Sequence, residues 1–180
     1  MIVNGMKARF RLVMDSEGGS RITRLLSRRE YLYPLIAEFT VRPNQGDPSG
    51  FDMGDMRWSG DLGEAVSTGK NPDQGMMIHL SIAHVLDCLR PVLEGRTKNA
   101  SFAGVDTSFR LVFHSGKKGI MISSPSGPVG RFDPSELAGA LLLAAEDFLT
   151  ENVSALPPSD AGMQDYLLSL NKFRKIALSL

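Results

Sequence analysis

The chain has 180 residues, of which 42% are hydrophobic and 22% charged, a size and composition typical of one globular domain. Twenty Lys/Arg offset twenty Asp/Glu, and this zero net charge argues against a protein that binds polyanions over much of its surface. Cys88 is the single cysteine, which excludes an internal disulfide and a thiolate metal cluster within one chain.

The charges are unevenly distributed along the chain. Residues 1–42 contain eight Lys/Arg and four Asp/Glu, whereas residues 43–75 contain two Lys/Arg and six Asp/Glu. Either the two segments lie close together and offset each other, or the acidic segment faces a basic partner. The N-terminus lacks the long apolar core of a secretory signal, and the longest apolar run, 140–145, is too short for a membrane span. We therefore expect a cytoplasmic protein without a membrane partner.

Two early segments have the alternating pattern of strands. The first, 6–14, places its basic residues on the wet face. The second, 31–41, begins as an edge or bulge because of Pro34, and its core-facing residues are expected to be Leu35, Ala37, Phe39 and Val41. Between the two, the segment 21–29 is ambiguous.

Residues 43–75 are rich in glycine and proline and predict an irregular acidic loop without a long regular element. Loops of this length within a compact domain are usually functional or mobile. Within it, the stretch from Trp58 to Val66 could form a short strand or a helical turn.

The second half predicts more regular structure. The stretch 76–93 is either one helix or a strand at 76–80 that turns into a helix at 81–93. A β-hairpin follows, with a turn at 115–119, and then a short Gly/Pro connection. Asp133, Pro134 and Glu136 have the spacing of a helix N-terminus. The apolar face expected for this helix consists of Leu137, Leu141, Ala144 or Ala145, and Phe148.

These elements predict an α+β fold, with an antiparallel sheet and helices packed on one face. We expect a single domain over 1–156 and, after Pro157 and Pro158, an amphipathic C-terminal helix over 157–180 that packs on the domain or on a partner. The apolar stripe of this last helix runs from Met163 to Ile176, and it could also support homo-oligomerisation.

The densest group of chemically active side chains consists of His79, His84, Asp87 and Cys88. On a helix His84 and Cys88 share a face, which suggests a thiol activated by an imidazole. Neighbours on one helix leave little room for a substrate, and the five-residue step from His79 to His84 misses the spacing of two helical metal ligands. The simpler interpretation is a structural one, with Cys88 as inert core packing. His114, beside the hairpin turn, is expected at the surface.

Several familiar motifs are missing or incomplete. The sequence has no Gly-x-Ser-x-Gly elbow and no Gly-rich dinucleotide fingerprint, and the turn at 115–119 lacks the glycine and the Ser/Thr of a phosphate loop. We therefore expect no cofactor and no bound metal. The arginines of the segment 9–29 could form a basic patch, but few aromatic residues lie near them to stack on bases, so a nucleic-acid partner is disfavoured.

The acidic segment is the strongest candidate for a binding site. Its carboxylates surround a tryptophan, as in recognition surfaces where an aromatic anchor supplies affinity and charge steers the partner. The predicted partner-binding residues are Asp52, Asp55, Trp58, Asp61 and Glu64. The alternative is that Trp58 belongs to the core and the carboxylates only keep the surface soluble.

The layout of the second half resembles small bacterial proteins of the toxin-immunity kind. The resemblance rests on the strand 120–124 and on the segment 132–137 that opens a helix. It implies a catalytically inert protein that blocks a partner. We therefore predict a non-enzymatic interaction module, possible alternatives being a small metal- or thiol-dependent enzyme and, third, a nucleic-acid binder.

Overall fold

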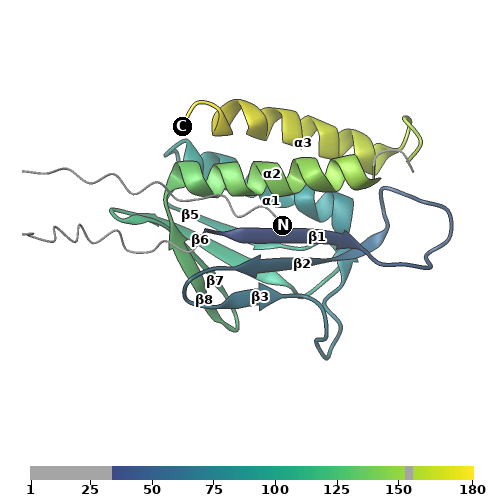
Figure 1. The fold of residues 1–180 in the computed structure, drawn as a ribbon, viewed down its shortest axis with the longest axis horizontal. Helices are drawn as coiled ribbons and strands as arrows, with labels where there is room; N and C mark the ends of the chain where they lie inside the picture. Colours follow the sequence, from purple (N-terminus) through teal and green to yellow (C-terminus); the bar gives the residue numbers. More distant parts are fainter. Residues whose placement is uncertain (1–33, 153–155) are drawn as a thin grey trace, which may run out of the picture. The chain divides into compact units, whose positions relative to one another are not determined.

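The computed structural model describes residues 34–152 and 156–180. Two four-stranded antiparallel sheets and three helices form this part of the chain (Figure 1), which confirms the predicted α+β class. The strand predicted at 6–14, the ambiguous segment 21–29 and the first residues of the strand predicted at 31–41 lie outside the described residues.

The first sheet is centred on β2 (Met53–Ser59). One edge of β2 pairs with β1 (Ile36–Val41) over six positions. The other edge pairs with β3 (Glu64–Val66) at one end and with β4 (Met76–Met77) at the other. On β1 the predicted alternation is confirmed, because Phe39 is buried while its neighbours on either side are exposed.

The prediction that 43–75 is irregular was wrong for β2, whereas β3 lies within the stretch from Trp58 to Val66 for which a short strand was one of the two alternatives. Gly54, Met56 and Trp58 are buried at alternate positions of β2, as a strand requires. Gly54 does not interrupt the strand. It allows close packing, since a Cβ atom at this position would lie 2.5 Å from the Cβ atom of Ile78.

The second sheet has the simple order β5-β6-β7-β8. Its middle hairpin, β6 (Arg110–Gly116) and β7 (Gly119–Ser124), is the one predicted from the sequence. β5 (Asn99–Ala103) pairs with the outer edge of β6. The predicted Gly/Pro connection is instead a further strand, β8 (Gly127–Phe132), whose register with β7 shifts at Ile122/Ser123.

The three helices lie together on one side of the sheets (Figure 1). They are α1 (Ile78–Leu93), α2 (Pro134–Asn152) and α3 (Ala161–Ala177). α1 packs against α3 and β5, and α2 packs against α3 and β1. Of the two alternatives predicted for 76–93, the strand that turns into a helix is confirmed. The strand, β4, is only two residues long, so the helix begins earlier than predicted.

One core joins the sheets and the helices. The Trp58 ring lies 6.4 Å from that of Phe39 and 6.0 Å from that of Phe113, so the tryptophan connects both sheets. Phe39 also contacts Phe148 of α2, with ring centroids 6.4 Å apart. The face predicted for α2 is confirmed by four fully or nearly fully buried residues: Leu137, Leu141, Ala145 and Phe148.

The C-terminal helix α3 is an integral part of this core. Met163, Tyr166, Leu170 and Phe173 of its apolar stripe are buried, and the Tyr166 hydroxyl donates a hydrogen bond to the Ala145 carbonyl of α2 at 2.5 Å. Most of the stripe therefore packs within the chain, and homo-oligomerisation stays a prediction. Of the predicted stripe, only Leu167 is exposed.

Candidate functional site

The structure separates the five residues predicted to bind a partner. Trp58 is fully buried in the core, because alternate residues of β2 face inward. Asp55 is only 7% exposed, although it lies on the opposite face of the strand. Neither side chain can contact a partner in this fold, which corrects the prediction for these two residues.

Asp55 belongs to an ion-pair network at the end of β1. The Arg42 guanidinium donates to both carboxylate oxygens of Asp55, at 2.7 and 3.0 Å, and to both oxygens of Asp73, at 2.7 and 2.8 Å. The Ser67 hydroxyl also donates to Asp55, at 2.6 Å. Burial alone would raise the pKa of Asp55, but the hydrogen bonds from Arg42 and Ser67 outweigh it and lower that pKa. This saturated network ties the loop before β4 to the first sheet, and it has a structural role.

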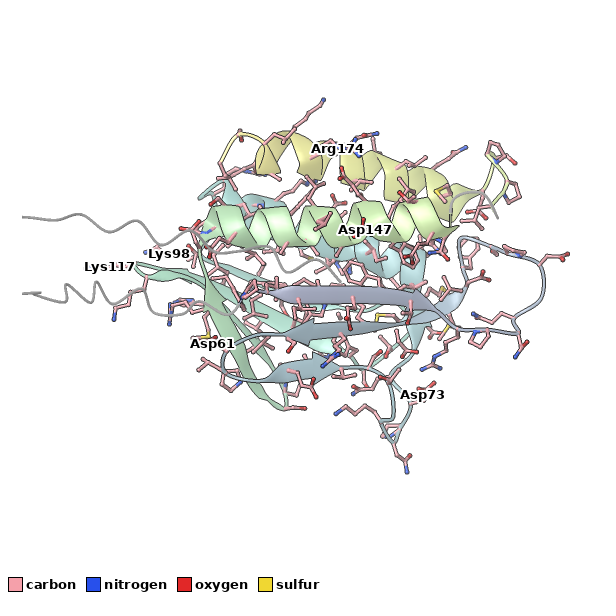
Figure 2. All side chains as sticks on the ribbon, viewed as in Figure 1. Asp61, Asp73, Lys98, Lys117, Asp147 and Arg174 are labelled. Carbon is pink, nitrogen blue, oxygen red and sulfur yellow. The ribbon has the colours of Figure 1, made fainter. Side chains whose placement is uncertain are left out.

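Asp61 and Glu64 lie at the other end of β2, on and beside the turn to β3, and both are exposed. Figure 2 shows Asp61 and Asp73 on loops at opposite ends of the first sheet. Glu64 accepts hydrogen bonds from Arg57 at 3.3 Å, an exposed pair of small energetic weight. The binding role of Asp61 and Glu64 stays a prediction, but the carboxylates of the acidic segment do not form a single surface.

Asp52, the fifth residue, lies in a different setting, beside a cavity of about 110 Å³. The cavity lies where the first sheet meets the start of α1 and the end of α2. Its outer wall includes the exposed Pro48, and its inner wall includes the buried His79. We call it the His79 cavity, and its lining residues are Val41, Pro48, Asp52, His79, Asn152 and Leu156.

His79, the second residue of α1, is 2% exposed. Its ring lies against the rings of Phe148 and Tyr166, with centroids 5.1 and 6.2 Å away. Neither ring nitrogen has a hydrogen-bond partner among the described residues. A buried imidazole without partners is unfavourable by about 1–3 kcal/mol per polar group. Such a group in a natural protein requires an explanation, such as stored strain, a catalytic role, or a bound water, ion or ligand.

Asp52 is held in place through its backbone and its side chain. The backbone N–H of Ile78, the first residue of α1, donates to the Asp52 carbonyl at 2.9 Å. The Ser49 N–H donates to Oδ2 of Asp52 at 3.1 Å. Because the residue before α1 provides no side-chain cap, this carbonyl serves one of the helix's unpaired N–H groups and fixes Asp52 next to His79.

The segment that carries Asp52 is also fastened to the start of α3. Asp160, the N-cap of α3, accepts hydrogen bonds from Met163 N–H at 2.8 Å and from Gly50 N–H at 3.1 Å. Gly50 approaches so closely that a Cβ atom there would lie 2.8 Å from Cα of Gly162. The hydrogen bonds from Met163 and Gly50 lower the pKa of Asp160, so its carboxylate is charged at neutral pH.

The electrostatics of the cavity keep His79 neutral. Burial lowers the pKa of His79, and the carboxylates of Asp52 and Asp160 raise it by a smaller amount, so the net direction is downward. At neutral pH the ring therefore has one donor and one acceptor nitrogen. A neutral imidazole and a carboxylate can together bind a molecule that both donates and accepts hydrogen bonds.

The other members of the predicted cluster have structural contacts. His84 and Cys88 share one face of α1, as predicted, and this face lies along β5: His84 Nδ1 is 3.1 Å from the Ala103 carbonyl, and Cys88 Sγ is 3.8 Å from the Ser101 carbonyl. Burial, and to a lesser degree Asp87, raise the pKa of the Cys88 thiol, which disfavours a thiolate nucleophile.

Asp87 forms links within and between helices. It accepts a hydrogen bond from Ser169 of α3 at 3.0 Å and pairs with Arg90 at 3.0 Å. His114 is exposed and lies 2.6 Å from the side-chain oxygen of Asn99. Within 34–152 and 156–180, no group of three or more His, Cys, Asp or Glu is arranged to hold a metal ion. The thiol- or metal-dependent enzyme considered as an alternative stays a prediction.

The sequence alone identified His79 and Asp52 but assigned them to separate sites. It did not identify Asn152 or the apolar walls of the cavity. A usable indication was present in the register: β4 precedes α1 directly and pairs with the first residues of β2, which brings Asp52 next to the start of the helix.

In the part of the chain that the structure describes, no helix has the length and apolar character needed to cross a membrane. No protein-family model matches the chain, no curated protein matches it, and no solved structure matches it.

Proposed function

We propose that this protein binds a small polar molecule in the His79 cavity. The observation that carries the proposal is the buried His79 ring, which borders the cavity and has no hydrogen-bond partner among the described residues. Asp52 provides a carboxylate at the same cavity, and Asn152 lies on its wall. Ligand sites commonly combine apolar walls with a few convergent polar groups of this kind.

The size of the cavity limits the ligand. A dry protein cavity of about 150 Å³ can accommodate a molecule as large as benzene. The His79 cavity, at about 110 Å³, has room for a molecule or group somewhat smaller than that. The best very small ligands gain about 1.5 kcal/mol per non-hydrogen atom, so a four-atom ligand would bind with a dissociation constant of roughly 40 μM at best.

The geometry favours binding over catalysis. No hydrogen bond joins the His79 ring to a carboxylate in the described residues, so His79 and Asp52 do not form an oriented acid–base pair. The cavity provides recognition groups but no nucleophile, since its lining contains no Ser, Thr, Cys or Lys among the described residues.

Ligand-observed NMR with fragments of about three to six non-hydrogen atoms tests the proposal. We expect fragments that bind the native chain and a His84→Phe control, but not a His79→Phe variant whose ring carries no polar atom. The control is matched because His84 lies on the same helix and outside the cavity. Equal binding to all three proteins, or no binding fragment at all, would contradict the proposal.

A second candidate function is the one expected from the sequence, capture of a basic protein partner. It is supported by the turn from β2 to β3, where Leu62 is 52% exposed between the exposed carboxylates of Asp61 and Glu64. An apolar side chain flanked by charges is suited to a small interface with steering. An immunity-like role would use this turn to cover a partner's site.

A pull-down from the native host tests this second candidate. The variant Asp61→Lys/Glu64→Lys should lose a captured protein that the native chain retains. Asp147→Lys/Glu151→Lys is the matched control, because it reverses two exposed charges on α2, and Figure 2 shows Asp147 far from Asp61. Equal capture by both variants would show that the turn is not the interface.

A further inference from the structure

We infer that the His79 cavity binds a small organic cation, a primary ammonium group on a short alkyl chain. This inference rests on the small-molecule binding proposed above and adds the charge of the ligand. It follows from the acceptors, the formal charges and the apolar walls that the fold brings together at the cavity.

Among the free hydrogen-bonding groups at the cavity, acceptors outnumber donors. The Ser49 N–H occupies Oδ2 of Asp52, which leaves Oδ1 available for a ligand. The neutral His79 ring adds one acceptor and one donor nitrogen, both buried and without a partner among the described residues. Asn152 uses one side-chain N–H to bond the Phe148 carbonyl at 2.8 Å, which leaves its amide oxygen and its second N–H for a ligand. An ammonium group donates three hydrogen bonds, which matches the number of these acceptors.

The formal charges at the cavity are negative. Asp52 lines it, and Asp160 lies close enough for its carboxylate to interact with the His79 ring. No Lys or Arg is among the lining residues that the structure describes. Two helix ends also meet here, the start of α1 at Ile78 and the end of α2 at Asn152. Their partial charges have opposite signs and largely offset each other, so the carboxylates determine the preferred ligand charge.

The remaining walls select an organic cation over a bare metal ion. Val41, Pro48 and Leu156 present apolar surface, which suits a short alkyl chain. Asp52 and His79 are only two possible metal ligands, and the described residues contain no group of three. An alkylammonium uses both features of the cavity, with its charged group near Asp52 and His79 and its chain along the apolar wall.

Three probes of nearly equal size and different charge test the inference: n-propylammonium, 1-propanol and propanoate. Each is titrated at pH 7.5 and constant ionic strength while the NMR resonances of the His79 ring are followed. We expect saturable shifts with n-propylammonium, about tenfold weaker binding of 1-propanol, and no binding of propanoate. Higher salt should weaken the binding of the ammonium only.

The variant Asp52→Asn isolates the charge. It retains the backbone carbonyl that accepts the Ile78 N–H, and its side-chain oxygen can still accept the Ser49 N–H, so the fold should persist. It should bind n-propylammonium about tenfold more weakly and 1-propanol equally well. Asp61→Asn, which removes an exposed carboxylate at the other end of β2, should bind both probes as the native chain does.

The possible results distinguish the preference for a cation from the binding of small molecules in general. If 1-propanol or propanoate binds as well as the ammonium, or if Asp52→Asn leaves the affinity of the ammonium unchanged, the cation preference is refuted and small-molecule binding stands. If none of the three probes and no fragment moves the His79 resonances, both are refuted.

Discussion

Replacement of His79 by phenylalanine should stabilise the free protein. His79 is 2% exposed, lies against Phe148 and Tyr166, and has two ring nitrogens without partners in the described residues. Phenylalanine has nearly the same shape and no polar atoms, so it fits an aromatic environment without leaving a donor or acceptor unpaired. A residue retained for ligand binding at the expense of stability behaves in this way.

The magnitude follows from the two nitrogens. A buried polar group without a partner is unfavourable by about 1–3 kcal/mol. Both ring nitrogens are buried and lack partners among the described residues, so the penalty applies to each of them. The extra volume of the phenyl ring offsets part of the gain. We expect a net increase of about 1–2 kcal/mol in the free energy of unfolding at pH 7.5, or a melting temperature higher by about 2–8 °C for a chain of this size.

The effect should depend on pH, with a definite sign. Burial lowers the pKa of His79 in the folded state below the ordinary value near 6.5. Between these two values the unfolded chain binds a proton that the folded chain does not, so stability falls as the pH falls below about 6.5. The His79→Phe variant lacks this term. The stability difference between the variant and the native chain should therefore widen from pH 7.5 to pH 5.5.

Urea unfolding at pH 7.5, 6.5 and 5.5 measures both expectations, provided that the slope with denaturant is the same for all proteins. His84→Phe is the control, because His84 is exposed and lies on the same helix. We expect its stability to differ from that of the native chain by no more than about 0.5 kcal/mol. If His79→Phe is destabilised by about 1 kcal/mol or more, the ring forms stabilising hydrogen bonds in the free protein and the reasoning fails.

Three further substitutions test the contacts around the cavity and the core. Arg42→Met leaves the Asp55 carboxylate buried with one hydroxyl partner. The free energy of unfolding, measured by urea titration, should therefore fall by about 3 kcal/mol. A fall of less than about 1 kcal/mol would contradict the structural role of the network. Tyr166→Phe removes the buried hydrogen bond to α2 and should lower the free energy of unfolding by about 1 kcal/mol, whereas an unchanged urea midpoint would argue against that bond. Gly162→Ala places a Cβ atom 2.7 Å from the Gly50 carbonyl oxygen, and a loss of about 1–3 kcal/mol is expected, so a neutral result would contradict this close approach.

The parts of the fold that could be predicted from the sequence are those in which local pattern and tertiary environment agree. The β6–β7 hairpin and the α2 face both have regular apolar spacing, and the structure has both. Alternation on β1 likewise predicted its inward face. In each case one side of the element is buried and the other exposed, which is the condition under which periodicity is informative.

The strands β2 and β8 were not predicted because glycine and proline obscure their pattern. Both residue types are depleted in strands in general, so their presence suggests a loop. In β2 the glycine permits close packing against α1. In β8, a Cβ atom at Gly130 would lie 2.6 Å from Oδ1 of Asp61, on the turn from β2 to β3, so glycine again allows a close contact. Such contacts are between segments distant in sequence, and the local composition does not reveal them.

The candidate site could be predicted only in fragments for the same reason. Asp52 was identified for its charge and His79 for its side chain, but a cavity is formed by residues whose proximity depends on sheet register and helix packing. Trp58 illustrates the opposite error. An aromatic residue among carboxylates suggested a surface anchor, whereas the strand alternation placed it in the core and left the carboxylates outside or in an ion pair.

The position of His79 within α1 also supports a functional role. The buried residues of this helix are otherwise almost entirely apolar or small, and its polar residues His84, Asp87 and Arg90 have partners in the neighbouring elements or on the helix itself. His79 alone in this group combines near-complete burial with an absence of partners in the described residues. A residue retained for packing alone would be better replaced by an apolar one, since the flanking rings of Phe148 and Tyr166 require no polar atom. His79 is therefore the residue that departs from the pattern of α1, and it lies at the cavity. Residues that depart from such a pattern are often found at functional sites.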